Sequence, residues 1–165
     1  MPVRPVTFAL RATHSGRYGS GGDDGRFQDI YLGYPELIRG YDDVGVEECV
    51  PDATSSCPLY DRLFGSRVLV ASAELRAPLW GLFKGKLSYG PLPVEIALFA
   101  DAGVAWTGSQ KASFLGGDRS FLTSVGAALR ANVFGFLVAQ ISAAKPLDRP
   151  GRSGWVWQWS LSPGF

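Results

Sequence analysis

The residues of this sequence that could do chemistry are charged side chains set in apolar surroundings. Arg39 lies in the tetrad Ile38-Arg39-Gly40-Tyr41, and Asp101 lies in Phe99-Ala100-Asp101-Ala102-Gly103, an F-x-D-x-G pattern. A planar guanidinium can hold a carboxylate through two parallel hydrogen bonds, and in a confined space it needs such a partner. The chemistry that these residues indicate is therefore ion pairing. Nothing in the chain supports catalysis, and we expect it not to be an enzyme.

Composition excludes several other classes of function. The chain has 16 Lys and Arg against 15 Asp and Glu, so it has no basic field for nucleic acid and we expect no nucleic-acid partner. Two cysteines and one histidine cannot build a zinc framework, and we expect no metal or cofactor. An apolar and aromatic share of 46% is too high for a disordered chain. No apolar run approaches the roughly 20 residues of a membrane-spanning helix.

The elements that must position these residues have a period of two. In PVEIALFADAGVAW, from Pro93 to Trp106, the even positions are all apolar and the odd positions include Glu95, Asp101 and Gly103. Successive side chains of a strand point to opposite faces, so this segment is a two-sided strand. The same alternation predicts seven strands, at about residues 5–14, 27–34, 66–79, 93–107, 121–133, 136–146 and 154–165.

The predicted fold class is all-β, an antiparallel transmembrane β-barrel. Several strands have about ten residues or more, near the length that crosses a bilayer. The link at residues 134–135 is short, whereas those at 35–65, 108–120 and 147–153 are long, as in outer-membrane barrels. One face of the strands carries Glu74, Arg76, Asp101 and Arg130, which suits a wet lumen. A soluble β-sandwich or ligand-binding β-barrel also has alternating strands and stays open as an alternative.

The number of strands indicates that the barrel is incomplete. Single-chain bacterial barrels have an even number of strands and at least about eight. We therefore expect residues 1–165 to be the C-terminal part of an outer-membrane barrel domain, with a long loop at 35–65. Closure would need the remaining strands or other copies of the chain, because open edges and an exposed apolar face favour aggregation.

The two motifs, their order and their strand parity resemble the barrel of the BamA/TamA family, the bacterial surface antigen domain. The resemblance covers roughly Gln28 to Phe165. It implies a barrel of roughly sixteen strands in the bacterial outer membrane. It also implies that the tetrad sits at the tip of a long loop folded into the lumen, where Arg39 pairs with Asp101 and Glu74. Gly40 would allow a tight turn, Tyr41 would stack in the lumen, and Gly103 beside Phe99 would leave room on the wall.

Two further features take their meaning from this resemblance. The terminal segment GWVWQWSLSPGF is similar to the C-terminal signal of outer-membrane barrels, with Trp157, Trp159, Leu161 and Phe165 on one parity. Its alternating aromatic residues would also anchor the strand at the membrane boundary. Cys49 and Cys57 lie in EECVPDATSSCPLY, and in an oxidising envelope we favour a disulfide that stiffens this loop over two free thiols.

The function that the resemblance implies is not catalytic. It is the insertion and assembly of outer-membrane proteins, or the translocation of proteins across the outer membrane. The expected partners are the lipid bilayer and unfolded outer-membrane or secreted client proteins. A passive outer-membrane pore, or an anchor or exporter for an upstream domain, is the first alternative, and a soluble ligand-binding β-barrel is the second.

Overall fold

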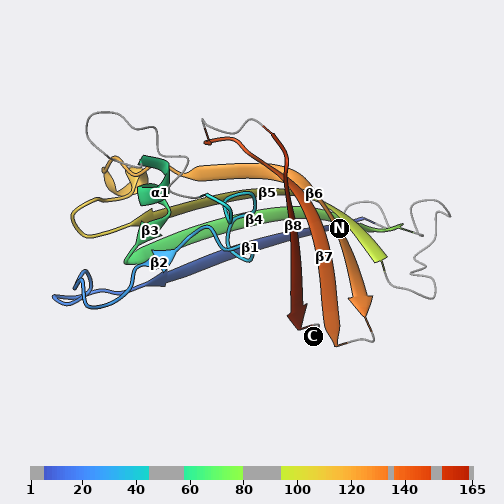
Figure 1. The fold of residues 1–165 in the computed structure, drawn as a ribbon, viewed down its shortest axis with the longest axis horizontal. Helices are drawn as coiled ribbons and strands as arrows, with labels where there is room; N and C mark the ends of the chain where they lie inside the picture. The colour runs from blue at the N-terminus through green and yellow to red at the C-terminus, as the bar shows by residue number, and fades with distance from the viewer. Residues whose placement is uncertain (1–5, 45–57, 80–93, 134–135, 150–153, 164–165) are drawn as a thin grey trace.

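The computed structural model describes residues 6–44, 58–79, 94–133, 136–149 and 154–163. Within these ranges β-strands predominate (Figure 1). The strands are β1 (Thr7–Gly16), β2 (Ile30–Tyr31), β3 (Phe64–Gly65), β4 (Arg67–Pro78), β5 (Val94–Trp106), β6 (Leu122–Val133), β7 (Leu137–Pro146) and β8 (Val156–Pro163). The helices are α1 (Pro58–Arg62) and a single 3-10 turn at Ser113–Leu115. No helix in the described ranges has the length and apolar character needed to cross a membrane.

One antiparallel sheet contains the long strands in the order β1-β4-β5-β6-β7-β8. The short strands β2 and β3 lie between β1 and β4 in the chain and form a separate two-stranded sheet. In the described part of the chain the large sheet stays open, because β1 and β8 each pair on one side only. The chain therefore has the antiparallel all-β fold that the alternating pattern predicts.

The two faces of this sheet differ as the period of two requires. Strand register places one apolar row directly across β4 to β8: Leu75, Leu98, Ala127, Ala143 and Trp157. Leu98 is 56% exposed and Trp157 is 73% exposed, so this outer face is uncovered along much of its width. Asp101 and Glu74, on the opposite parity, are buried on the inner face. A soluble sandwich would cover the apolar face rather than the charged one.

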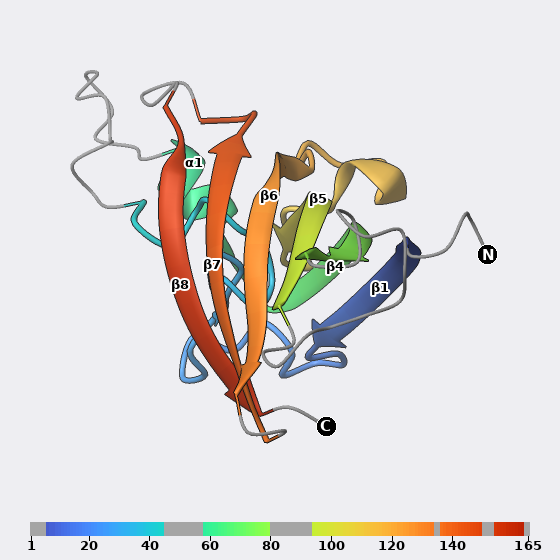
Figure 2. The same cartoon turned by 90° about the vertical axis from the view of Figure 1, so that its right-hand side faces the viewer.

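The inner face is buried by the segment that connects β1 to β4. In Figure 2 much of the described part of this segment, coloured light blue to green, lies behind β6, β7 and β8. Its apolar side chains pack against those of the strand ends and form one cluster: Leu32, Ile38, Tyr41, Val44 and Leu63 from the segment, with Val68, Val70, Ala105 and Leu122 from the sheet. The loop is thus held in place by a small hydrophobic core of its own.

The prediction that residues 27–34 form a strand of the large sheet was wrong. Only Ile30 and Tyr31 are in strand conformation, and they pair with Phe64 and Gly65. The alternation there reflects packing within the loop, where Leu32 is fully buried and donates its N–H to the carbonyl of Leu63 at 2.7 Å. Six of the seven expected strands therefore form the sheet.

The outer face is covered at one end of the sheet. Trp106 shares the parity of Leu98, yet it is only 5% exposed. The connection from β5 to β6 folds back over it, and the ring of Phe114 meets Trp106 edge to face with centroids 5.6 Å apart. On its other side the indole stacks on the ring of His14 at 5.6 Å. Local loop packing thus overrides the outward direction that parity alone predicts.

Candidate functional site

The site is built around Arg39, whose side chain is buried against the inner wall of the sheet. Its Nε donates to Asp101 Oδ2 at 2.7 Å and its Nη2 donates to Asp101 Oδ1 at 2.7 Å, a bidentate pair. The Ser72 hydroxyl donates to Asp101 Oδ1 at 2.6 Å and accepts from Arg39 Nη2 at 3.2 Å. Arg39 is 4% exposed and Asp101 is 3% exposed. Removal of Arg39 would leave the carboxylate of Asp101 buried without its cation, and removal of Asp101 would take away the bidentate partner of Arg39; both changes are costly.

A second carboxylate and an aromatic ring complete the surroundings of the guanidinium. Arg39 Nη1 lies 2.8 Å from Glu74 Oε1. The guanidinium carbon stands 3.5 Å above the ring centre of Phe99, so the cation also interacts with the aromatic face. Every edge of the guanidinium fork is thereby engaged, and its orientation is fixed.

Strand register explains why these groups converge. Ser72 lies opposite Asp101, and Glu74 lies opposite Phe99, on the neighbouring strands β4 and β5. Because residues two apart share a face, all four side chains point to the same patch of wall. On the next strand Gly126 lies opposite Phe99, and a Cβ there would fall 2.6 Å from Phe99 Cζ. Gly126 thus leaves the space that the ring occupies, a role that sequence reasoning missed.

The next residue of the tetrad, Gly40, is fixed by shape and by backbone hydrogen bonding. Its φ is +91°, in the left-handed region that favours glycine. A Cβ at this position would fall 3.2 Å from Ala144 Cβ and 3.3 Å from Pro146 Cδ on β7. Its N–H donates to Oε1 of Gln158, a buried side chain of β8, at 2.9 Å. The loop tip therefore contacts the last described strand as well as β4 and β5.

Tyr41 ties the tetrad to the sheet at the start of β6. It is fully buried, and its hydroxyl donates to the carbonyl of Thr123 at 2.8 Å. Its own carbonyl accepts from the hydroxyl of Tyr31 at 3.0 Å. Burial raises the pKa of the Tyr41 phenol to about 12, and the nearby charge of Asp148 acts in the same direction. The phenol is therefore a neutral hydrogen-bond donor at ordinary pH.

Arg149, in the connection after β7, is a site residue that sequence reasoning missed. Its Nη1 donates to the carbonyl of Gly40 at 3.1 Å and lies 2.7 Å from Asp43 Oδ1. The side chain is buried although it follows the end of a strand. No periodicity marks this position, and only the folded loop reveals its partner.

The other residues expected at the site have separate places. Gly103 faces the loop, and a Cβ there would fall 3.0 Å from Leu32 Cδ1, so its absence lets the loop approach the wall. Ile38 is fully buried in the loop core and does not take part in the ion pairs. Trp157, Trp159 and Leu161 are exposed on the outer face of β8, away from the tetrad. Cys49, Cys57 and Phe165 lie outside the described residues.

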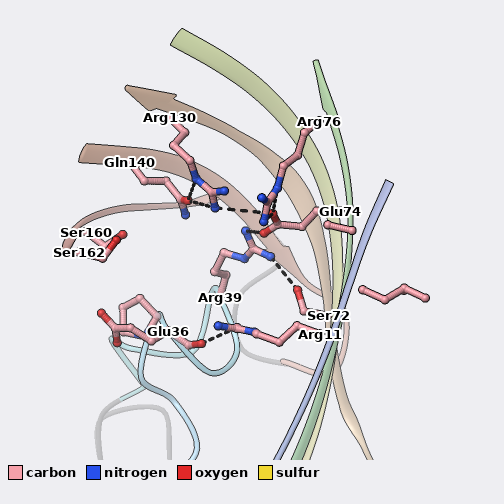
Figure 3. Close-up of a pocket in the computed structure, with 13 residues that line it drawn as sticks. Arg11, Glu36, Arg39, Ser72, Glu74, Arg76, Arg130, Gln140, Ser160 and Ser162 are labelled. Carbon is pink, nitrogen blue, oxygen red and sulfur yellow. Dashed lines mark hydrogen bonds and ion pairs between the residues drawn. The ribbon is translucent and has the colours of Figure 1, made fainter. Parts of the chain in front are cut away.

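The wall beside Arg39 carries further arginines. Arg76 donates from Nε to Glu74 Oε2 at 2.7 Å, and Arg130 lies 3.6 Å from the same oxygen. Figure 3 shows Arg76 and Arg130 converging with Arg39 on Glu74. The described ranges hold no group of three His, Cys, Asp or Glu side chains suited to a metal ion. The arrangement can therefore clamp a loop and present charge.

These features together define a class of protein: an antiparallel sheet of membrane-crossing strand length, with an apolar outer face and a long loop ion-paired to a polar inner wall. The Omp85 superfamily domain matches residues 3–165, and the chain belongs to this superfamily. The superfamily comprises bacterial outer-membrane proteins that act in protein insertion and translocation. The sequence resemblance is therefore confirmed at this level, and the sheet is part of an Omp85 barrel fold. No curated protein and no solved structure matched the chain.

Proposed function

We propose that this chain acts in the bacterial outer membrane as a barrel of the BamA/TamA type, which inserts client outer-membrane proteins or translocates proteins across that membrane. The observation that carries the proposal is the bidentate pair between Arg39 and Asp101, joined by Glu74. This clamp holds a long loop inside the lumen face, where it sets the shape of the space that a client meets. The role is mechanical rather than catalytic, and it requires no cofactor.

The loop distinguishes this proposal from a passive pore. A pore needs an unobstructed passage, whereas this loop brings its own hydrophobic core and two sets of polar contacts onto the wall. So much buried contact favours a working part over an open channel. The uncovered outer face, with Trp157 and Trp159 exposed, favours lipid as its neighbour over the water around a soluble ligand-binding barrel.

The test is client assembly in cells or proteoliposomes by the full-length protein with Arg39→Ala or Asp101→Ala. We expect both variants to lose most of the activity and the protection of the loop from protease, while the heat-modifiable folded band of the barrel persists. The control is Arg26→Ala, because Arg26 is exposed and pairs with Asp24 within a single turn. Full client assembly by both clamp variants would refute the proposal.

A further inference from the structure

A cavity lies beside the clamp, and its walls carry more positive than negative charge. It has a volume of about 230 Å³. The charged side chains that line it are four guanidiniums and two carboxylates, those of Arg11, Arg39, Arg76, Arg130, Glu36 and Glu74. The guanidinium of Arg39 is already matched by Asp101. Whether the other three guanidiniums are neutralised therefore depends on the contacts that Glu74 and Glu36 make.

The available carboxylates do not match the guanidiniums. Glu74 gives one oxygen to Arg39 and the other to Arg76 at 2.7 Å. Arg130 reaches that second oxygen only at 3.6 Å, and its shorter bond, 2.7 Å, goes to the neutral amide oxygen of Gln140. Arg11 donates at 2.6 Å to the backbone carbonyl of Glu36, which is also a neutral acceptor. Two of the four cations thus have neutral groups as their closest partners in the described structure.

The uncharged walls add hydrogen-bonding groups suited to an anion. Gln140 on β7 and Ser160 and Ser162 on β8 line the cavity opposite Arg76 (Figure 3). Ser160 lies directly across from Gln140 in the strand register. A hydroxyl or an amide N–H can donate to a carboxylate oxygen already bound by a guanidinium. The cavity therefore offers charge and neutral donors around one space.

The location of the cavity limits what can reach it. Arg130, Gln140 and Ser162 lie near the end of the sheet where β6 is joined to β7 by a short connection. The loop core lies toward the other end, near Val68, Ala105 and Leu122. In outer-membrane barrels short turns face the periplasm and long loops face outward. A chain arriving from the periplasm would meet the cavity before it meets the loop.

From these observations we infer that the cavity is a binding site for anionic groups, and that its ligand is a carboxylate-bearing segment of a client chain. This inference rests on the proposed function, since a client must enter from the periplasmic side. Glu or Asp side chains of the segment would bind Arg130 and Arg11, whose closest present partners are neutral. A segment with the same shape and amide side chains would lack the charge-assisted bonds and bind more weakly.

The experiment measures binding of a short labelled Glu-containing peptide to the full-length protein in nanodiscs, with the Gln-containing counterpart as the matched probe. We expect the Glu peptide to bind roughly tenfold more tightly, with an affinity that falls as salt rises. Arg11→Gln combined with Arg130→Gln should abolish the difference. Arg26→Gln, which changes an exposed arginine outside the cavity, should leave it intact.

A second variant keeps the inference testable if the double variant folds poorly. Gln140→Glu is close in size and would supply Arg130 with an internal carboxylate at its present hydrogen-bonding position. We expect this variant to lose preferential binding of the Glu peptide while keeping its folded band. Equal binding of the two peptides by the unaltered protein, or retained preference in Gln140→Glu, would overturn the inference.

Further outcomes distinguish this inference from a general small-anion site and from the proposed function. Inorganic phosphate that displaces the Glu peptide with equal affinity would show a general small-anion site and overturn the assignment to a client segment. If the protein binds the Glu and Gln peptides equally while Arg39→Ala still loses client assembly, this inference fails and the proposed function stands. If the preference is present but Arg39→Ala assembles clients normally, the proposed function fails instead.

Discussion

The loop is attached to the sheet by two anchors that differ in kind. One is ionic and fastens Arg39 to β4 and β5 through Asp101 and Glu74. The other is neutral at its contacts with β6 and β8, where Tyr41 and Gly40 use hydrogen bonds and close fit. A buried ion pair fails completely when one partner is removed, whereas a neutral hydrogen bond is worth only about 1 kcal/mol. The ionic anchor should therefore decide whether the loop docks, and the neutral anchor should adjust how firmly.

The largest effect should come from Arg39→Met in the ionic anchor. Methionine keeps much of the length of the side chain but leaves Asp101 and Glu74 without their shared cation, and breaking a buried pair costs about 3–5 kcal/mol. We expect a matching loss in the free energy of loop docking, measured by protease cleavage rates at the loop over a urea series. The comparison between the anchors would break down if this variant docked as well as the unaltered protein.

Gly40→Ala should have the next largest effect, through the neutral anchor. A left-handed backbone costs an alanine about 1–2 kcal/mol, and its Cβ would also press on Ala144 and Pro146. The matched control is Gly19→Ala, because Gly19 has φ +89° but no atom within 4 Å of its would-be Cβ. Both variants carry the backbone strain, and only Gly40→Ala should speed loop cleavage. Equal cleavage rates in the two variants would show that fit at β7 does not matter.

Gln158→Leu should weaken the neutral anchor by a smaller amount. It removes the acceptor of the Gly40 N–H, and an unpaired buried N–H costs about 1–3 kcal/mol. Gln158 Nε2 is itself buried without a partner in the described structure, and its removal offsets part of that cost. We therefore expect the free energy of loop docking to weaken by about 1 kcal/mol in the same cleavage assay. Ser162→Ala, on the same face of β8 but lining the cavity, serves as the control and should not change docking.

The smallest effect at neutral pH should come from Tyr41→Phe, which loses one neutral hydrogen bond worth about 0.5 kcal/mol, because the carbonyl of Thr123 keeps the N–H of Leu147 as a donor. Alkaline pH should enlarge the role of this residue. The folded pKa of about 12 lies above the ordinary value near 10, so docking of Tyr41 is fully favoured below pH 10. As pH rises from about 10 to about 12, the released phenol ionises while the docked phenol does not, and docking weakens. The decline measured by loop cleavage should be shallower in Tyr41→Phe, and identical slopes would contradict this account.

The two anchors also differ in how far sequence reasoning could reach them. Glu74 and Asp101 are carboxylates in apolar alternating strands, Arg39 lies in the loop tetrad, and the resemblance to the BamA/TamA family implied that the three residues pair. Gln158 and Arg149 carry no comparable mark, because a glutamine on a strand and an arginine in a connection are ordinary surface residues. The contact of Gly40 with β7 depends on where a distant strand passes. The ionic anchor was therefore open to prediction, and the neutral one was not.

The sequence by itself determined the period of two, the apolar and polar faces and the antiparallel order, because side-chain direction in a strand follows from position alone. Through its resemblance to the BamA/TamA family it also implied that a loop arginine and two wall carboxylates pair. Only the tertiary structure decided that residues 27–34 pack within the loop, that Trp106 is covered, and that Gly126 makes room for Phe99. Those outcomes depend on which segments, remote in the chain, come to occupy the same space. No local pattern encodes that competition for volume.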